Sequence, residues 1–210
     1  MLFLNVPYEE KDEAKSMYAR WDKYKKKWYA TNPKFYFRFK KWIEGSSVAQ
    51  NKVYIAVAAI NCWKCKNSTP VYAFAIHGED IIDLENNIND MANETGYDMA
   101  IIPIDHKLPR DIKSYLEKNT ACKETHSKTT KTSYFANVCE KCSVLQGAYF
   151  VYDEFDSPFK GNSNGPLKFI EFELENDISI NYEVGESFIS PAIKLFNENN
   201  IIKSDIKVSQ

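Results

Sequence analysis

Four of the five cysteines in this chain of 210 residues stand in two Cys-x-x-Cys pairs, which constrain the fold more than any other feature. The first pair is Cys62 and Cys65, and the second is Cys139 and Cys142. Two residues between cysteines let one tight turn, called a knuckle below, direct both sulfurs at a common point. Two knuckles form a tetrahedral set of thiolates, which suits zinc and leaves no coordination position for water or substrate. The spacing therefore predicts a structural zinc site.

The two pairs are far apart in the sequence, because 73 residues separate Cys65 from Cys139. A compact zinc ribbon needs far fewer residues, so we expect the intervening segment to fold by itself, with the metal clamping its two ends. The alternatives are two unrelated pairs or one redox-active pair. A redox-active pair follows a strand at the start of a helix, and neither pair shows that context clearly.

Charge is distributed unevenly along the chain, although its net charge is only −2. Residues 1–44 carry eleven Lys and Arg against six Asp and Glu, a net charge of +5. The net charge is −1 over residues 45–150 and −6 over residues 151–210. A basic head of this kind attracts nucleic acid, or it neutralises the acidic tail by packing near it.

The sequence carries neither a membrane span nor an export signal. Its longest apolar run, residues 53–60, is much shorter than the ~20 residues that a membrane helix needs. The amino terminus lacks the basic and long apolar regions of a signal peptide. We therefore expect a soluble, cytoplasmic protein, in which paired cysteines favour metal over disulfides.

Periodicity and turn residues predict an α+β fold in two parts. A small β-α-β head over residues 1–44 is followed by a linker at 45–51 and a larger mixed domain over 52–210. In the head we expect strands at 2–6 and 27–31, a helix at 9–18, a charged turn at 23–27, and either a strand or a short helix from 35 to 44. In the larger domain we expect strands at 52–61, 70–76, 99–104, 133–138, 144–155, 167–174, 178–184 and 201–208, helices at 109–119 and 187–199, an irregular segment at 81–95 and a loop at 120–132.

Aromatic and basic residues are interleaved in the head. Single-stranded nucleic acid is held by such mixtures, because aromatic rings stack on bases and cations neutralise phosphates. The residues expected to make these contacts are Arg20, Trp21, Lys25, Lys26, Lys27 and Arg38. Alternatively, a head of this size needs its few aromatic residues for its own core.

Other chemical groups are more scattered. Glu171, Glu173 and Glu175 recur with period 2, so we expect them on one face of a strand. A metal-dependent nuclease could use such a row, but a solvated strand face is the simpler interpretation. Cys122 and His126 have a C-x3-H spacing without obvious further ligands.

His77 and His106 are isolated histidines, and we expect no catalytic role for either. The chain has no glycine-rich phosphate-binding motif, no nucleophile elbow and no His-Glu zinc-protease motif. The sequence therefore identifies no catalytic residue.

The head resembles a small bacterial domain of unknown function, which recurs in proteins linked to plasmid transfer, including TraC-like primases. The segments that carry the resemblance are Leu4-Asn5-Val6-Pro7-Tyr8, Lys11-Asp12-Glu13-Ala14-Lys15, Ala19-Arg20-Trp21-Asp22 and Lys27-Trp28-Tyr29. The resemblance covers roughly residues 2–44. It departs at Tyr18, where members usually have glycine, so we expect the preceding helix to end without a left-handed glycine cap.

The remainder resembles a companion region of uncharacterised bacterial proteins. The matching segments are Cys62-Trp63-Lys64-Cys65, Thr69-Pro70-Val71, Phe135-Ala136-Asn137-Val138-Cys139 and Leu145-Gln146-Gly147. Ser143 replaces the glycine that generally follows the second pair. The two resemblances imply a cytoplasmic, zinc-containing accessory protein of mobile elements, and they supply no reaction.

Three functions are consistent with these features. The leading hypothesis is a non-catalytic zinc protein that acts on or with nucleic acid through the head and the knuckles. The second is a protein-interaction adaptor or inhibitor linked to mobile elements, whose acidic tail meets a basic partner. The third is a metal-dependent nuclease whose site is not identified.

Overall fold

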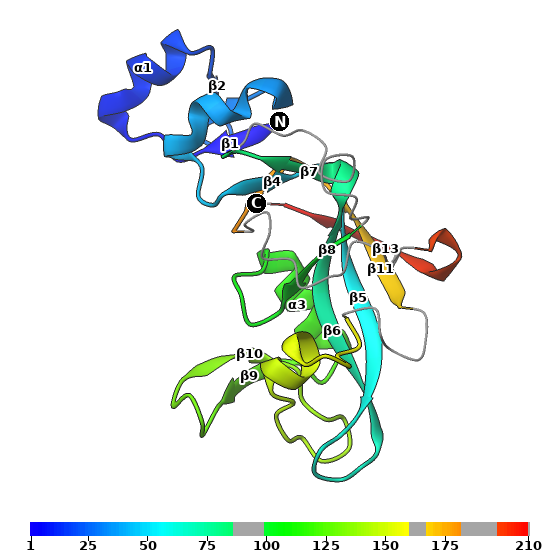
Figure 1. Cartoon of the computed structure of the whole chain (residues 1–210). Coiled ribbons are helices and arrows are strands. Elements are labelled where there is room, and N and C mark those ends of the chain that lie inside the picture. Colours follow the sequence, from blue (N-terminus) through cyan, green and yellow to red (C-terminus); the bar gives the residue numbers. More distant parts are fainter. Residues whose placement is uncertain (86–98, 160–166, 182–196, 210) are drawn as a thin grey trace.

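The computed structural model describes residues 1–85, 99–159, 167–181 and 197–209 (Figure 1). Over these residues the fold is mixed α+β and consists mostly of strands, as the sequence predicts. The strands are β1 (Leu2–Leu4), β2 (Arg20–Asp22), β3 (Lys27–Ala30), β4 (Ser47–Ala49), β5 (Lys52–Asn61), β6 (Ser68–His77), β7 (Ile81–Asp83), β8 (Met99–Pro103), β9 (Lys123–His126), β10 (Ser133–Ala136), β11 (Lys168–Leu174), β12 (Ile178–Ile180) and β13 (Ile201–Val208).

Helices are few and short. The α-helices are α1 (Lys11–Ser16) and α3 (Arg110–Asn119), the 3-10 helices are η1 (Tyr8–Glu10), η2 (Pro33–Trp42), η3 (Gly78–Asp80) and η5 (Glu198–Asn200), and η4 (Tyr149–Asp153) is a π-helix. No helix within the described ranges is long and apolar enough to cross a membrane.

A five-stranded sheet in the order β13-β11-β5-β6-β8 forms the centre of the molecule. Its longest pair is the β5–β6 hairpin, in which Ile55 lies opposite Phe74. Strand β11 runs antiparallel to β5 and parallel to β13. The expected strands at 52–61 and 201–208 coincide with β5 and β13.

Both faces of the central sheet are covered, which explains why β5 and β6 are apolar almost throughout. On one face, Ile55 and Phe74 belong to a core that includes Leu116 of α3. On the other face, Tyr54 belongs to a core that includes Tyr152 of η4. The sheet therefore separates α3 from η4.

The head is a three-stranded sheet in the order β1-β3-β2, with α1 and η2 packed near it. Helix η2 resolves the two expectations for residues 35–44 in favour of a helix. Its Tyr36, Phe39 and Trp42 are buried at a spacing of three, which is the period of a 3-10 helix. Asn32 begins this helix by accepting a hydrogen bond from the Lys34 N–H at 3.1 Å.

The interval expected as a linker, residues 45–51, contains the buried strand β4 instead. β4 lies between β12 and β7, and its Val48 packs in the same core as Trp42. The sequence did not predict this strand because it has no long apolar run. Its Ser47 and Ala49 are small enough to be fully buried. The boundary between residues 44 and 52 remains a prediction.

Two further expectations about secondary structure were wrong. Residues 120–132, expected as a loop, contain β9, which pairs antiparallel with β10. Residues 144–155, expected as a strand, contain the π-helix η4, whose Val151 and Tyr152 point into the core. The aromatic pattern of residues 144–155 fits a strand, but it fits equally well a single helical turn that buries two residues.

Some expected elements lie wholly or partly outside the described residues. Most of the helix expected at 187–199 and of the irregular segment at 81–95 falls there. Of these intervals the structure describes β7, and the 3-10 helix η5 that follows Asn197.

Candidate metal centre and basic groove

The two knuckles have the same backbone geometry although they are distant in sequence. In the first, the Cys62 N–H donates to the Asn67 carbonyl and the Lys66 N–H donates to the Cys62 carbonyl, both at 2.9 Å. In the second, the Cys139 N–H donates to the Val144 carbonyl at 2.9 Å, and the Ser143 N–H donates to the Cys139 carbonyl at 2.8 Å. Each knuckle is thus closed by the same two hydrogen bonds.

The residue after each Cys-x-x-Cys pair adopts a left-handed backbone. φ is +60° at Lys66 and +55° at Ser143. Glycine adopts this conformation at the lowest cost, which explains why glycine suits the position that Ser143 occupies. A serine there keeps the geometry at some energetic cost.

The fold brings the four cysteine sulfurs together. The first knuckle lies at the tip of the β5–β6 hairpin, and the second follows β10. The sulfur atoms of Cys62 and Cys142 are 3.7 Å apart, those of Cys65 and Cys139 are 3.6 Å apart, and all four lie within 4.8 Å of one another. A tetrahedral ion with metal–sulfur bonds of about 2.3 Å places its ligands roughly 3.8 Å apart. The cluster can therefore hold one metal ion.

Polar groups around the sulfurs favour thiolates at some positions. The backbone N–H and side-chain amide of Asn67 lower the pKa of Cys65 to about 6. The Val144 N–H lowers the pKa of Cys142, but burial and the three neighbouring sulfurs outweigh it and raise this pKa to about 11. The side-chain amide of Gln146 lies 3.5 Å from the Cys62 sulfur, as a hydrogen-bond donor outside the four cysteines.

The second knuckle is anchored by Asn137, whose role the sequence analysis missed. Its amide accepts from the backbone N–H of Tyr72 at 2.8 Å and donates to the Tyr72 carbonyl at 3.0 Å. It also donates to the Tyr152 hydroxyl at 2.9 Å. The only signal in the sequence is the position of Asn137, two residues before Cys139 in the segment that carries the second resemblance.

Cys122 and His126 do not form a second metal site. The Cys122 sulfur is buried and lies 3.5 Å from the Asn137 side-chain oxygen, and burial raises the pKa of this thiol to about 11. His126 is exposed on β9, where its ring nitrogen lies 3.4 Å from the Ser133 hydroxyl. Among the described residues, the four-cysteine cluster is the only metal-ligating group found.

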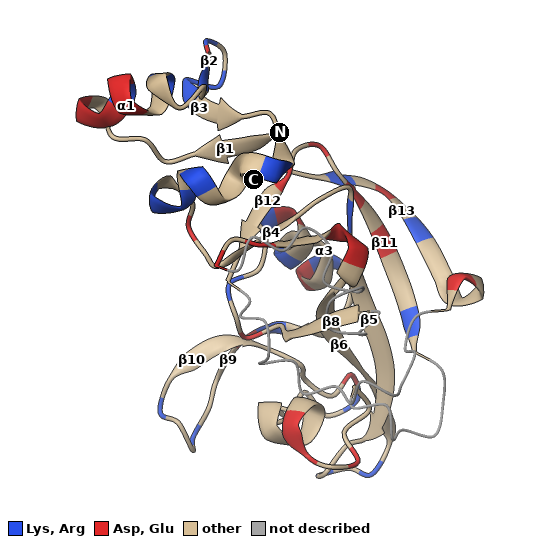
Figure 2. Cartoon of the chain, turned by 45° about the horizontal axis from the view of Figure 1, so that its top comes forward, with Lys and Arg blue, Asp and Glu red and all other residues tan. Residues whose placement is uncertain are grey.

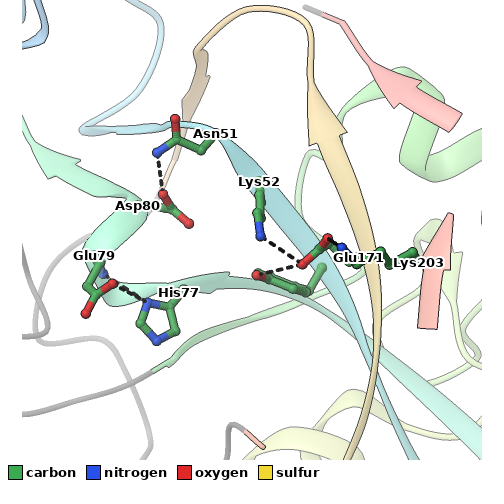
Figure 3. Close-up of polar contacts among 8 residues, drawn as sticks. Asn51, Lys52, His77, Glu79, Asp80, Glu171 and Lys203 are labelled. Atoms are coloured by element: carbon green, nitrogen blue, oxygen red, sulfur yellow. Dashed lines mark hydrogen bonds and ion pairs between the residues drawn. The ribbon is translucent and has the colours of Figure 1, made fainter. Parts of the chain in front are cut away.

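The expectation of a solvated row of glutamates holds for Glu173 and Glu175, which are exposed, and fails for Glu171. The Glu171 side chain is only 6% exposed, and it accepts from Lys52 at 3.2 Å and from the Tyr54 hydroxyl at 3.4 Å (Figure 3). Lys203 of β13 lies 3.9 Å from its other oxygen. Glu173 is exposed and pairs with Lys207 at 3.1 Å. The expectation failed at Glu171 because β11 is an inner strand, and its neighbours β5 and β13 supply Lys52 and Lys203 from both sides.

Glu171 borders an open cleft of about 750 Å³ that also has His77, Glu79 and Asp80 on its rim. Figure 3 shows His77 directed at Glu79 and Asp80 directed at Asn51, across the cleft from Glu171. Within the described ranges, no three carboxylates or histidines converge here as metal ligands. The cleft therefore gives no support to a metal-dependent nuclease. His106 lies in the turn after β8, apart from these groups.

The aromatic residues of the head divide into core and surface. Tyr36, Phe39 and Trp42 are buried, whereas Trp21 is 47% exposed and Tyr24 is 98% exposed. Trp21 contacts Trp28 edge-to-face, with ring centroids 5.5 Å apart. The expectation of a core role is therefore confirmed for Tyr36, Phe39 and Trp42, while nucleic-acid contact by the exposed rings stays a prediction.

A groove of about 460 Å³ runs along the head beside Trp21 and Trp28. Tyr8 also lines it, with the Lys11 ammonium 3.7 Å from the ring centroid of Tyr8. The other residues at the groove are Leu4, Asn5, Val6, Lys26 and Lys27. Figure 2 shows basic residues at the β2–β3 turn and also on η2, with acidic residues on α1.

The six residues expected to contact nucleic acid do not share one surface. Trp21, Lys26 and Lys27 line the groove. Arg20 is the neighbour of Trp21 on β2, so its side chain projects from the opposite face of the small sheet. Two of the six lie against other rings.

Lys25 lies 4.8 Å from the Phe3 ring centroid, and Arg38 lies 4.6 Å from that of Phe35. Within the part of the chain that the structure describes, none of the six residues forms an ion pair with a carboxylate. By contrast, Lys41 of η2 pairs with Glu13 at 2.6 Å and with Glu10 at 3.2 Å. Not every cation of the head is therefore equally available to a ligand.

Comparison with known proteins finds a similarity in the head. Residues 1–44 match the model of a domain of unknown function, DUF5710. The chain is similar to the DNA primase TraC of Escherichia coli, with 47% identity over 47 residues. This match covers 22% of the chain and 3% of the primase, so the chain spans a small fraction of that relative's length. No solved structure matches the chain.

Proposed function

We propose that this chain is a non-catalytic, zinc-binding accessory protein whose head binds single-stranded nucleic acid. The observation that carries the proposal is the groove between η1 and β2, where three aromatic residues stand beside three lysines. Tyr8, Trp21 and Trp28 offer ring surfaces for unstacked bases, and the lysines offer charge to phosphates. The similarity of 47 residues of the chain to a segment of a DNA primase is consistent with such a role.

The groove suits a single strand better than a duplex. Its aromatic rings can stack only on bases that are not already stacked on their neighbours. The groove also lies beside the edge strand β2, which leaves the exposed face of Trp21 open to solvent. Lys26 and Lys27 at the β2–β3 turn are then placed to meet the backbone of the strand.

Binding tests this proposal through its salt dependence. We expect affinity for a labelled single-stranded oligonucleotide to fall steeply with salt, because phosphate contacts release counterions. Replacing Lys26 and Lys27 by Gln should reduce the slope of log affinity against log salt by about 1.4. Fluorescence anisotropy measures this. The matched control replaces Lys15 and Lys34, which are exposed lysines outside the groove.

Stacking is tested separately. Trp21→Ala should weaken binding by about 1–3 kcal/mol, the range for one base–aromatic contact. Salt-insensitive binding, or equal effects of the groove and control lysines, would contradict the proposal.

For the four-cysteine cluster we propose zinc as a structural ion that clamps the ends of the segment between the knuckles. Cys62, Cys65, Cys139 and Cys142 would be its ligands, and zinc would supply cross-linking rather than chemistry. We expect elemental analysis to find about one zinc per chain. Cys62→Ser should lose the metal and destabilise the fold, while Cys122→Ala should retain the metal. Iron in place of zinc, or retention of metal by Cys62→Ser, would refute this assignment.

A further inference from the structure

A second aromatic site lies at the opposite end of the molecule from the head. Figure 1 shows the tip of the β5–β6 hairpin and the yellow helix η4 far from the blue head. Between the hairpin tip and η4 is a pocket of about 200 Å³, the size of one or two side chains. Its apolar lining includes Ile60, Trp63, Phe150 and Pro158. Two of these are surface aromatics, since Trp63 is 57% exposed and Phe150 is 56% exposed.

The charge at this pocket is acidic. Glu154 and Asp156 line it, and no Lys or Arg is among its described lining residues. Neither carboxylate forms an ion pair with a cation in the described parts of the chain. Glu171 differs, because it forms ion pairs with Lys52 and Lys203. Two carboxylates that have no ion-pair partner among the described residues, and that lie beside aromatic faces, attract a cation and repel phosphate.

The pocket is held in shape by the knuckles. The Trp63 indole N–H donates to the Leu145 carbonyl at 2.8 Å, which fixes the ring against the second knuckle. The next residue, Gln146, lies 3.5 Å from the Cys62 sulfur. Phe150 packs against Gly147 so closely that a β-carbon there would lie 3.4 Å from its ring. A site that is formed before binding saves the cost of ordering its side chains.

We propose that this pocket binds an arginine side chain from a basic segment of a protein partner. A guanidinium stacks on an aromatic face and donates in a fork to a carboxylate, so Trp63 or Phe150 together with Glu154 or Asp156 matches both of its requirements. The volume admits one such side chain. Tyr149, which is exposed and lies edge-to-face with Phe150 at 5.5 Å between ring centroids, offers an apolar contact to a residue that flanks the arginine.

This interaction is independent of nucleic-acid binding by the head. The pocket is acidic and remote from the basic groove, so one chain can hold a nucleic acid at one end and a basic protein segment at the other. Such a chain would link the two partners without chemistry of its own.

Peptide binding to the full chain in its metal-bound form tests the proposal. The probe is an acetylated Gly-Ser peptide that carries two arginines, and its matched control carries citrulline, which has the same shape without the charge. The readout is the NMR signal of the Trp63 indole N–H, identified with Trp63→Phe. We expect the arginine peptide to shift this signal, and the citrulline peptide to leave it unchanged at the same concentration.

Substitutions at the pocket provide the second arm of the test. Glu154→Gln together with Asp156→Asn should weaken arginine-peptide binding by about tenfold or more, because charge-assisted hydrogen bonds are lost. Glu140→Gln, an exposed acid of the second knuckle outside the pocket, should have no effect. The head's nucleic-acid affinity should be the same in all these variants, so failure of one proposal is distinguishable from failure of the other.

Several outcomes would overturn the assignment. These are equal binding of the citrulline peptide, equal effects of the pocket and Glu140 variants, and absence of binding at millimolar peptide. A Trp63 shift that depends on protein concentration without peptide would also overturn it, because the occupant would then be a second copy of the chain.

Discussion

At the scale of single residues, several positions in this chain adopt a left-handed backbone, which favours glycine over the residue present. The helix α1 ends in a Schellman motif, in which the Tyr18 N–H donates to the Lys15 carbonyl and the Ala19 N–H to the Ala14 carbonyl, both at 3.0 Å. The helix ends without a glycine cap, as expected, but a left-handed cap forms there nevertheless. Tyr18 itself adopts φ +70°, so the cap forms and its cost falls on a tyrosine.

Tyr18→Gly should therefore stabilise the protein by about 0.5–1 kcal/mol, because glycine adopts the left-handed conformation without steric cost. Little packing is lost, since the Tyr18 side chain is 85% exposed. Chemical denaturation measures the change in the free energy of unfolding. Tyr24→Gly is the control, because Tyr24 is also exposed but has no positive φ, and it should be neutral or destabilising. Equal losses of stability in both variants would show that handedness does not limit stability at Tyr18.

The clustering of the four cysteines was predictable at this scale because the geometry of each pair is local. Two residues between cysteines determine each knuckle, and the structure brings the four sulfurs together as the spacing predicts. The role of Gln146 was not predictable, because its contact with Cys62 depends on how the two knuckles meet.

At the scale of elements, buried polar contacts join segments that the sequence keeps apart. The Asn137 amide bonds to Tyr72 of β6 as a neighbouring strand would. It accepts from the Tyr72 N–H and donates to the Tyr72 carbonyl. The Tyr152 hydroxyl from η4 donates to the same carbonyl at 2.7 Å and accepts from the Ile104 N–H at 3.2 Å. β6, β8, η4 and the second knuckle therefore meet at one hydrogen-bonded point.

Asn137→Ala should destabilise the fold by about 2–4 kcal/mol, because it leaves the buried Tyr72 N–H without its partner and removes a donor from Tyr152. Asn119→Ala is the matched control, since the exposed Asn119 amide makes one local bond to the Tyr115 carbonyl. It should cost well under 1 kcal/mol. Thermal or denaturant unfolding of both variants in their metal-bound form decides the point. Similar values would mean that Asn137 is not a structural centre.

The strands of the central sheet could be predicted and their environment could not. Apolar runs predicted β5, β6 and β8, because a strand covered on both faces needs them, and alternation predicted β11. The period-2 glutamates predicted a solvated face, which was wrong for Glu171, since its neutralisation by Lys52 and Lys203 depends on strand order. Alternation along a strand also explains why the head splits its expected binding residues. Arg20 and Trp21 are neighbours on β2, so their side chains lie on opposite faces of the small sheet.

At the scale of the whole molecule, the head and the rest of the chain share a core. Val48, Ile82 and Leu84, from beyond the predicted boundary, pack with Trp42 and the other buried residues of the head. A buried hydrogen bond reinforces this contact, because the Tyr36 hydroxyl of η2 donates to the Asp177 carboxylate at 2.5 Å. The amino terminus and Gln50 approach the same carboxylate oxygen, at 3.4 Å and 3.3 Å. None of these contacts is visible from composition.

We therefore expect the head and the central sheet to unfold together. Trp21, Trp28 and Trp42 are in the head, so tryptophan fluorescence reports mainly on it, whereas far-ultraviolet circular dichroism reports mainly on the strands. The two signals should show one denaturant midpoint. Tyr36→Phe should lower the free energy of unfolding by about 1.5–3 kcal/mol in both signals, the range for hydrogen bonds to charged groups. Tyr29→Phe, at a partly exposed tyrosine of the head, should change little.

The pH dependence gives the same contact an independent test. Burial and then the hydrogen bond to Asp177 raise the pKa of Tyr36. Its neutral form is thus favoured in the folded state, and the stability that it contributes is present below the unfolded pKa of about 10 and is lost at higher pH. Tyr36→Phe should therefore lose part of the alkaline destabilisation that the unmodified chain shows. If Tyr36→Phe shifts only the fluorescence transition, the head unfolds by itself, and the boundary between residues 44 and 52 separates two independent domains.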